Sequence, residues 1–325
     1  MQSPPRRRSL WRRFRRRTRG PRNAFLAAAI WYGGRLLGAL PVPVALAIGR
    51  ALGGGAHALL GQARRLALVQ LGIAFPTLDL DARERMVRAT FRHAGESFAE
   101  LTLWPKLARR PGYVRMEGRS FVDDALVAGR GVIVVTGHTG NWELLAAAVA
   151  ARYPLTVVAR RVNDDRFDAL VGRFRRSVGA EVLVRDDPHF LSGVRGALAR
   201  NRLVALLIDQ DTRGAGVFVP FFGRLAHTPP GPALLALRAR VPLVTVFIER
   251  SGDGHLVRFA PVAAEMRRGR EAIVALTAAL TAAIEAQIRR APAEWVWWHE
   301  RWRREPPPTA QVRGAASPAS RPAIS

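Results

Sequence analysis

A histidine and a glutamate lie five residues apart in the segment 137–143, which reads Gly-His-Thr-Gly-Asn-Trp-Glu. On one continuous helix this spacing separates two side chains by about 140°, so His138 and Glu143 would point to different sides. The glycines at positions 137 and 140 favour a tight turn instead, with Asn141 capping a helix that begins at Trp142. Glu143 would then lie in the first helical turn, from which its side chain can fold back towards the imidazole.

A carboxylate on one imidazole nitrogen fixes the tautomer and stabilises the imidazolium, which leaves the other nitrogen free to take a proton from an alcohol. We therefore expect His138 to be a general base oriented by Glu143. Taken alone, a histidine after a strand with a glutamate nearby is more often part of an ordinary polar turn than of a catalytic site. The spacing is not that of a zinc-binding pair of helical ligands, and the chain has no cysteine, so we expect neither a metal nor a cofactor.

Short β-branched stretches alternate with helical stretches through the second half of the chain. The alternation predicts an α/β fold with a largely parallel sheet flanked by helices. The predicted strands are 131–136, 155–159, 181–184, 203–208 and 242–248, with a weaker one at 256–260. The predicted helices between and after them are 142–151, 165–177, 190–200, 232–240 and 271–290.

In such sheets functional groups gather where parallel strands end. His138 follows the strand that ends at Thr136, and the segment Asp209-Gln210-Asp211 follows the strand that ends at Ile208. We expect Asp209 and Gln210 to contact the substrate or to brace the His138 loop, although a polar turn that caps the strand end is an equal alternative.

The N-terminal region divides into a basic arm and an apolar segment. Residues 1–22 contain ten arginines, and no aspartate or glutamate precedes Asp79 in a chain of net charge +26. Such a block of like charge predicts a disordered arm over 1–23 that binds an anionic membrane surface, with nucleic acid as the competing partner. Residues 24–62 are almost wholly apolar and predict two helices, about 24–40 and 44–62, broken at Pro41 and Pro43.

We interpret residues 24–62 as a membrane-anchoring segment that spans the bilayer or lies in its interface, with the arm in the cytoplasm. A buried helical hairpin of a soluble domain is the alternative. The catalytic domain is predicted to occupy 63–305, opening with amphipathic helices over 63–110. The segment 306–325 is rich in Pro, Ala and Ser and is predicted to be a disordered tail.

Several segments together resemble one family. Residues 137–143 are similar to the H-x4-(D/E) block of the lipid A late acyltransferases, which belong to the glycerolipid acyltransferase superfamily. Residues 207–211, 217–223 and 226–233 resemble that family's second long block, and Ala74-Phe75-Pro76 and residues 294–302 resemble flanking segments. The similar segments cover roughly residues 36–305. The sequence departs from the pattern at Gln70, where the family has asparagine, and at Glu300, where a basic residue is usual.

The resemblance implies transfer of a fatty acyl chain from acyl carrier protein, or from acyl-CoA, to a hydroxyl of a lipid A-type glycolipid. It implies a protein on the cytoplasmic face of the inner membrane that binds no nucleic acid. A phosphatidylinositol mannoside or an aminolipid is the alternative acceptor, and a binding protein or a catalytically inactive relative is a further alternative.

The resemblance also suggests residues that bind the substrate. Arginine suits bidentate phosphate recognition, and Arg160 in the stretch that ends at Asn163 is the first candidate. The complete predicted set of substrate-binding residues is Arg160, Asn163, Arg176, Asp209, Gln210, Phe222, Gly223 and Thr228. The tryptophans of 295–302 are predicted either to form an interfacial aromatic belt or to pack in the core.

Overall fold

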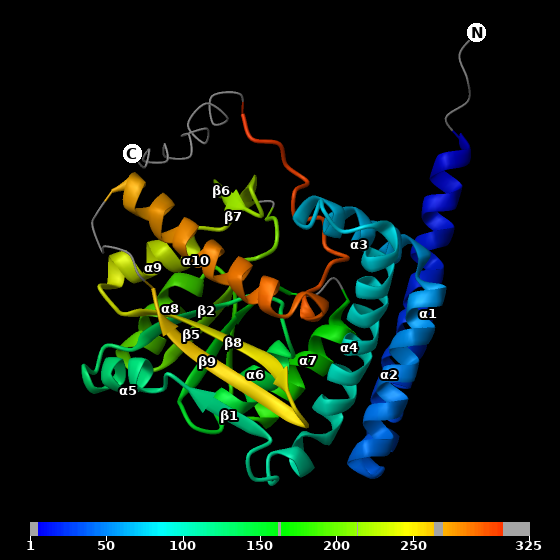
Figure 1. Cartoon of the computed structure of the whole chain (residues 1–325), viewed down its shortest axis with the longest axis horizontal. Coiled ribbons are helices and arrows are strands. Elements are labelled where there is room, and N and C mark those ends of the chain that lie inside the picture. The colour runs from blue at the N-terminus through cyan, green and yellow to red at the C-terminus, as the bar shows by residue number, and fades with distance from the viewer. Residues whose placement is uncertain (1–5, 162–163, 213, 263–268, 308–325) are drawn as a thin grey trace, which may run out of the picture.

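The computed structural model of the 325-residue chain describes residues 6–161, 164–212, 214–262 and 269–307. A seven-stranded sheet lies at the centre, with helices on both of its faces and a helical hairpin along one side (Figure 1). The predicted fold class is confirmed. The predicted tail over 306–325 lies almost wholly outside the described residues, since only 306 and 307 are described and they have no regular structure.

The sheet has the strand order β1-β9-β8-β2-β5-β3-β4, and every neighbouring pair is parallel except β8 and β9. Its strands are β1 (Val114–Glu117), β2 (Val132–Thr136), β3 (Leu155–Ala159), β4 (Glu181–Val184), β5 (Leu203–Leu207), β8 (Leu243–Ser251) and β9 (Gly254–Pro261). The separate hairpin β6 (Val217–Phe221) and β7 (Arg224–Thr228) is antiparallel. The sequence analysis predicted neither β1 nor this hairpin.

The helices form two layers. Alternate residues of β2 enter different hydrophobic clusters: Ile133 and Val135 join one, and Val132 and Val134 join the other. A strand buried on both faces shows this arrangement because successive side chains point to opposite sides. The first cluster packs under α8 (Phe190–Ala199), α9 (Gly231–Ala239) and α10 (Arg270–Arg290), and the second under α5 (Ser120–Val127) and α6 (Trp142–Ala150).

Four further helices precede the sheet, and α7 follows β3. These are α1 (Arg6–Ala39), α2 (Val42–Leu59), α3 (Gly61–Ala74), α4 (Leu80–Leu107) and α7 (Asp165–Ser177). The side chain of Asp79 caps α4 by accepting a hydrogen bond from the Ala82 amide, 2.6 Å away. The predicted break in the apolar segment is confirmed, since α1 ends at Ala39 and α2 begins at Val42 after Pro41.

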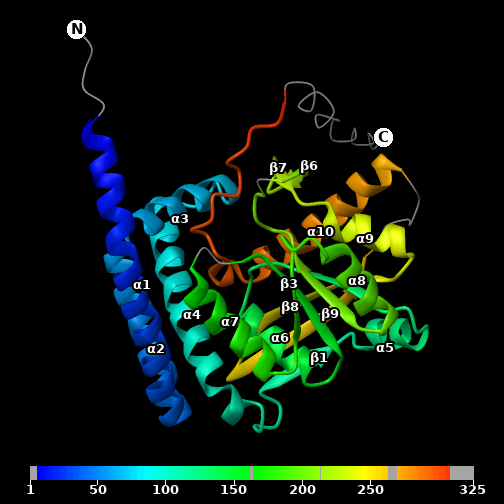
Figure 2. The same cartoon turned by 180° about the vertical axis from the view of Figure 1, so that it is seen from behind.

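The arginine-rich segment differs from its prediction. Backbone helix begins at Arg6 and continues without interruption into the apolar part of α1, so the disordered arm predicted over 1–23 is largely helical. Arginine is a good helix former, and extending an existing helix avoids the cost of nucleating a new one. Figures 1 and 2 both show the N-terminal end of α1 extending past the rest of the domain.

Helices α1 and α2 carry large apolar side chains on their outward surface. Leu36 is 71% exposed and Leu52 is 59% exposed, whereas a helix in a soluble core would bury such residues. The exposed group comprises Phe25, Leu26, Ile30, Trp31, Tyr32, Leu36, Val44, Ile48, Leu52 and Leu59. Among the described residues, α2 and α10 have the length and composition of a membrane span, and α2 has only 22% of its window buried.

Glycines allow α2 to lie unusually close to α4. A Cβ atom added at Gly53 would lie 2.2 Å from the Phe91 carbonyl oxygen, and one added at Gly95 would lie 2.2 Å from the Gly49 carbonyl oxygen. Both distances are shorter than any tolerable contact, so the two backbones approach as closely as glycine permits. The α1–α2 hairpin is therefore fixed against the domain by backbone packing along α4.

We predict that Gly53→Ala destabilises this crossing, by about 1–3 kcal/mol, because the added methyl group overlaps the α4 backbone. Gly55→Ala is the matched control, since a Cβ at Gly55 meets no atom within 4 Å. Thermal unfolding and limited proteolysis of the α2–α4 region measure the effect. Equal stability of the two variants would show that the close crossing is not required.

Candidate active site

The ends of β2 and β5 bring the two predicted polar segments together. These strands are adjacent and parallel, and their register pairs Thr136 with Leu207. The residues that follow, His138 and Asp209, therefore leave the sheet side by side at the same edge. The sequence predicts both strand ends, but the adjacency of the two strands is a property of the fold.

The carboxylate of Asp209 contacts His138 at two points. Its Oδ1 lies 2.8 Å from His138 Nδ1, and its Oδ2 accepts a hydrogen bond of 2.7 Å from the His138 backbone amide. An ionised carboxylate can only accept, so Nδ1 carries the proton and Nε2 presents a lone pair. The His138 side chain is 24% exposed, whereas that of Asp209 is fully buried.

Trp295 completes the environment of Asp209. Its indole N–H donates to Asp209 Oδ2 over 2.7 Å, and its own side chain is fully buried. Burial alone would raise the pKa of Asp209, but the adjacent His138 and the hydrogen bonds from His138 and Trp295 lower it to about 2. Asp209 is therefore ionised throughout the physiological range.

The C-terminal segment also holds the backbone of the His138 loop. Thr139 forms an isolated antiparallel bridge with Trp295, the Gly140 amide donates to the Glu294 carbonyl, and the Val296 amide donates to the His138 carbonyl. Gly140 has φ +62°, and a Cβ there would lie 2.1 Å from the Ile248 carbonyl oxygen. Only glycine fits this turn.

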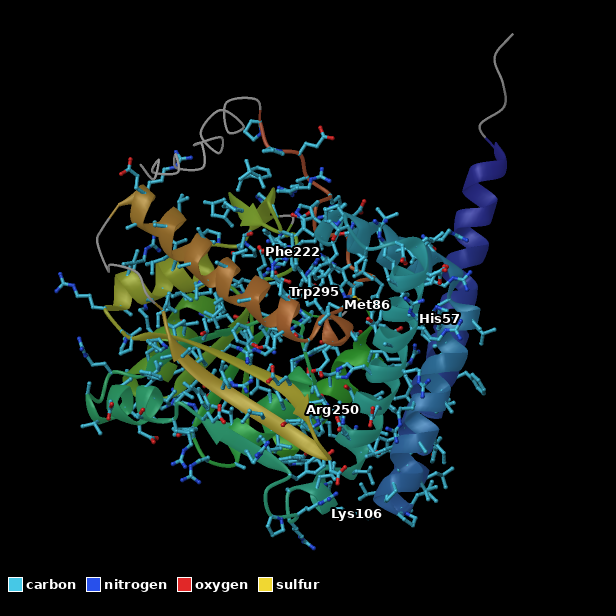
Figure 3. All side chains as sticks on the ribbon, in the orientation of Figure 1. His57, Met86, Lys106, Phe222, Arg250 and Trp295 are labelled. Atoms are coloured by element: carbon cyan, nitrogen blue, oxygen red, sulfur yellow. The ribbon has the colours of Figure 1, made fainter. Side chains whose placement is uncertain are left out.

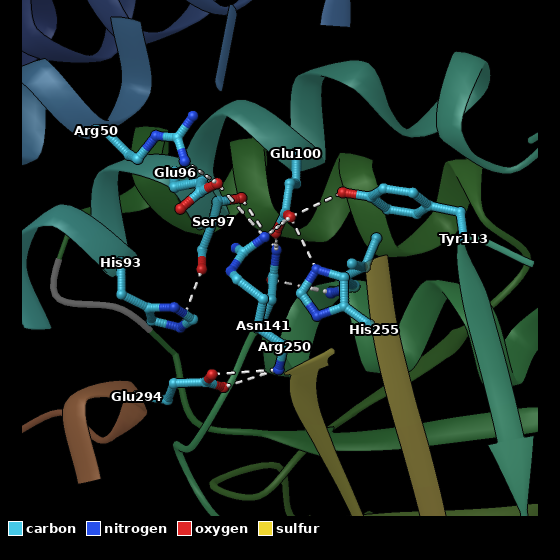
Figure 4. A network of polar contacts seen from close by, with 11 residues as sticks. Arg50, His93, Glu96, Ser97, Glu100, Tyr113, Asn141, Arg250, His255 and Glu294 are labelled. Carbon is cyan, nitrogen blue, oxygen red and sulfur yellow. Dashed lines mark hydrogen bonds and ion pairs between the residues drawn. The ribbon is translucent and has the colours of Figure 1, made fainter. Parts of the chain in front are cut away.

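A second buried carboxylate holds the other end of the loop. Glu100 of α4 is completely buried and accepts hydrogen bonds from Asn141, Tyr113, Arg250 and His255 (Figure 4). As predicted, Asn141 caps α6, because its Oδ1 accepts from the Leu144 amide at 3.1 Å. Burial raises the pKa of Glu100, but the hydrogen bond and charge of His255 and the Arg250 guanidinium lower it by more. The net pKa is well below its ordinary value, so the carboxylate is ionised.

Glu143 is placed differently from the prediction. Its carboxylate forms a bidentate ion pair with Arg175 of α7, with contacts of 2.5 Å and 3.0 Å, and both side chains are largely buried. The carboxylate that contacts the His138 ring is Asp209. The helix does start at Trp142, but its first turn directs Glu143 towards α7. Arg175 was not predicted, although the next residue on the same helix, Arg176, was.

The two arginines predicted to bind the substrate, Arg160 and Arg176, lie on the surface. Arg160 follows β3, is exposed, and lies 3.7 Å from Asp186. Asn163 lies outside the described residues. Arg176 is exposed on α7, and Gln210 is partly buried beside Asp209. Of Arg160, Arg176 and Gln210, only Gln210 adjoins the His138–Asp209 pair, because it directly follows Asp209 in the chain.

The predicted residues of the second block belong to the β6–β7 hairpin. Phe222 and Gly223 form its turn, with φ of +52° and +72°. Phe222 is buried and packs edge-on against Phe75, so it lies in the aromatic core (Figure 3). Thr228 is fully buried, and its hydroxyl accepts a hydrogen bond from Arg301.

Most of the segment 294–302 packs against the hydrophobic core, and Glu300 is exposed. Trp295 and Trp297 are fully buried with ring centroids 4.6 Å apart, which decides between the two predictions for the tryptophans in favour of core packing. Arg301 is fully buried and donates to the His227 carbonyl and to Thr228. Gln70, the departure from the family pattern, accepts a hydrogen bond from the Arg301 amide at 2.8 Å.

The arrangement provides a partly exposed imidazole, held by a buried carboxylate, at the carboxyl edge of a largely parallel sheet. This geometry suits proton transfer to and from a hydroxyl group. Among the described residues, no group of three or more histidine, aspartate or glutamate side chains is placed to hold a metal ion.

Comparison with known proteins identifies the class as acyltransferase. The model of the bacterial lipid A biosynthesis acyltransferase family matches residues 12–304, and the chain belongs to that family. The chain is 27% identical over 274 residues to the lipid A biosynthesis palmitoleoyltransferase of Escherichia coli, covering 82% of this chain and 87% of that protein. It is 26% identical to the lauroyltransferase of the same organism, with coverage of 82% and 88%.

A second group of relatives is named for a different acceptor. The chain is 32% identical over 182 residues to the phosphatidylinositol mannoside acyltransferase of Mycolicibacterium smegmatis. That match covers 55% of this chain and spans only 59% of the relative's length.

Two histidines near the site predict a dependence of stability on pH. Burial is the largest cause that lowers the pKa of His93 and of His299, each to about 4 from an ordinary value of 6.5. Between pH 4 and 6.5 the unfolded chain binds more protons than the folded protein. The free energy of unfolding therefore decreases as pH falls from about 6.5 to 4. Each histidine contributes roughly 1–3 kcal/mol to this loss.

We expect the double variant His93→Gln/His299→Gln to show a flatter dependence in urea unfolding measured across that pH window. The exposed His189→Gln is the control and should keep the slope of the parent. A double variant with an unchanged slope would contradict the assignment.

Proposed function

We propose that this chain is a membrane-associated O-acyltransferase that moves a fatty acyl chain from acyl carrier protein, or acyl-CoA, to a hydroxyl of a lipid A-type glycolipid. The observation that carries the mechanism is the contact between His138 Nδ1 and the buried Asp209 carboxylate. It leaves Nε2 as an unprotonated base on a ring that is 24% exposed.

In the proposed step, His138 Nε2 takes the proton of the acceptor hydroxyl as its oxygen attacks the carbonyl carbon of the acyl thioester. The tetrahedral intermediate then collapses, the carbon–sulfur bond breaks, and the departing thiolate takes the proton back from His138. The products are an ester and a free thiol. Asp209 stabilises the imidazolium between the two proton transfers.

Glu143 has a supporting role in this proposal. Its largely buried ion pair with Arg175 joins α6 to α7. The carboxylate that contacts the imidazole is therefore that of Asp209 and not that of Glu143. Removal of one partner of such a pair strands a charge in a poorly hydrated place. Glu143 therefore fixes the helix whose first turn follows the His138 loop.

Several features support a membrane glycolipid acceptor and an acidic donor. The relatives that match over most of the chain are named as lipid A biosynthesis enzymes. The outward surface of α1 and α2 is apolar, and the net charge of +26 suits an anionic membrane on the cytoplasmic face and an acidic carrier protein rather than nucleic acid. The mycobacterial relatives favour a phosphatidylinositol mannoside as the second candidate acceptor, and an aminolipid is the remaining one.

We expect His138→Ala to lower the rate of transfer of a labelled acyl chain by about 10²–10⁴, because the base is lost. Asp209→Asn should lower the rate by a similar factor, because an amide can accept or donate and no longer fixes the tautomer. Glu143→Gln retains the His138–Asp209 pair and should lose less activity than either. A fully active His138→Ala variant that folds normally would refute the catalytic assignment.

Lipid analysis identifies the acceptor. Mass spectrometry of lipids from cells lacking the protein should show one glycolipid without one acyl chain, and the wild-type gene, but not the His138→Ala gene, should restore it. In vitro, equal rates with the acyl carrier protein thioester and with acyl-CoA would exclude a carrier-specific donor. Loss of a chain from a phosphatidylinositol mannoside instead would establish the second acceptor.

A further inference from the structure

A cavity of about 620 Å³ opens between α2 and α4, away from the His138–Asp209 pair. Small residues of α2 form one wall, and cationic residues form the other. The lining residues are Ala47, Arg50, Ala51, Gly54, His57, Ala58, Arg88 and Arg92. Figure 3 shows His57 on the side of the molecule where α2 passes α4.

The charge of this cavity is positive and largely uncompensated. Three arginines line it and no carboxylate does. Arg50 lies 3.5 Å from Glu96, but neither Arg88 nor Arg92 has a carboxylate within ion-pair distance among the described residues. Arg88 and Arg92 line the cavity without an ion-paired carboxylate in the described part of the chain, and such guanidinium groups are suited to bind an oxyanion, with phosphate matching their geometry best.

A buried histidine adds a polar group to the same wall. The His57 side chain is 7% exposed, and its Nε2 has no hydrogen-bond partner, with the nearest carboxylate oxygen 4.0 Å away on Glu84. A buried nitrogen without a partner is unusual, because it loses its bond to water without a replacement. A ligand oxygen in the cavity would provide that partner.

The neighbouring surface indicates where such a phosphate comes from. Ala47 and Ala51 of α2 line the cavity. The same helix carries an exposed apolar stripe, four residues apart, that consists of Val44, Ile48 and Leu52. A lipid presents a phosphate next to apolar tails, so it matches a cationic cavity bordered by an apolar stripe. A soluble anion has no apolar part that could contact this stripe.

We propose that the cavity between α2 and α4 binds the phosphate group of a membrane lipid, with Arg50, Arg88 and Arg92 as its cationic ligands and His57 as a further hydrogen-bonding group. This site is separate from the His138–Asp209 pair, so the inference does not depend on the proposed acyl transfer.

Calorimetric titration of the full-length protein in neutral detergent with dihexanoyl phosphatidic acid tests the proposal. We expect saturable binding that weakens by about tenfold or more in Arg88→Gln/Arg92→Gln, since charge-assisted hydrogen bonds are lost. The exposed pair Arg195→Gln/Arg238→Gln removes the same charge from α8 and α9 and should bind as the parent does. Equal weakening in both pairs would mean that only net charge matters and would overturn the site.

A steric pair of variants tests the cavity itself. A Cβ at Gly54 or at Gly55 meets no atom within 4 Å, but only Gly54 lines the cavity. Gly54→Leu should therefore fill the space and weaken phosphatidic acid binding by about tenfold, whereas Gly55→Leu, with the same change in helix propensity, should not. Undiminished binding by Gly54→Leu would overturn the proposal.

Other ligands separate the possible sources of the anion. Dihexanoyl phosphatidylcholine, whose phosphate carries a cationic headgroup, should bind more weakly than phosphatidic acid. Inorganic phosphate that binds as tightly as phosphatidic acid would overturn the lipid assignment. If the arginine pair alters binding of acyl carrier protein but not of phosphatidic acid, the cavity is a protein-docking site instead. His138→Ala should bind phosphatidic acid normally, so failure of the catalytic proposal and failure of this one are distinguishable.

Discussion

The buried carboxylate of Asp209 is the group around which the site is built. An ion removed from water costs several kcal/mol unless donors replace its hydration. Here the His138 amide, the His138 ring and the Trp295 indole supply them, and they come from segments far apart in the chain. The charge that gives the imidazole its orientation therefore also fixes the strand ends of β2 and β5 and the C-terminal segment in one arrangement.

A second buried carboxylate acts on the same loop from the opposite end. Glu100 holds Asn141, which caps α6, while Asp209 holds His138 at the end of β2. Gly140 lies between these points in a conformation that only glycine accepts against the Ile248 carbonyl. The loop is thus fixed at both ends by ionised groups and in its middle by steric exclusion. Such a loop keeps the imidazole in place without relying on a ligand.

The sequence predicted the elements well because the signals for them are local. Hydrophobic periodicity located the strands and helices around β2, β3, β4 and β5, and a capping asparagine located the start of α6. The partner of His138 could not be found in this way. Glu143 was preferred because it is close in sequence, whereas Asp209 is 71 residues away and meets His138 only because β5 pairs with β2. Trp295 and Arg175 depend on tertiary packing in the same manner.

The arginine-rich segment shows a different limit. Its charge density argued for disorder, but it is joined to an apolar helix that is already formed, and helix extends through it from Arg6. The sequence locates the boundary between the arginine-rich segment and the apolar segment. It does not show how far a helix continues across that boundary.

The α1–α2 hairpin and the His138 loop are connected through one helix, α4. Gly49 and Gly53 of α2 contact α4 at backbone distance around Gly95, and five residues further along α4 Glu100 reaches Asn141. Backbone contacts and buried ion pairs are stiff, so the His138 loop keeps a set position relative to the apolar surface of α1 and α2. In the proposed reaction, His138 must reach the acceptor hydroxyl at a set depth relative to the membrane. The glycine crossing and Glu100 together provide that relation, which a flexible tether would not.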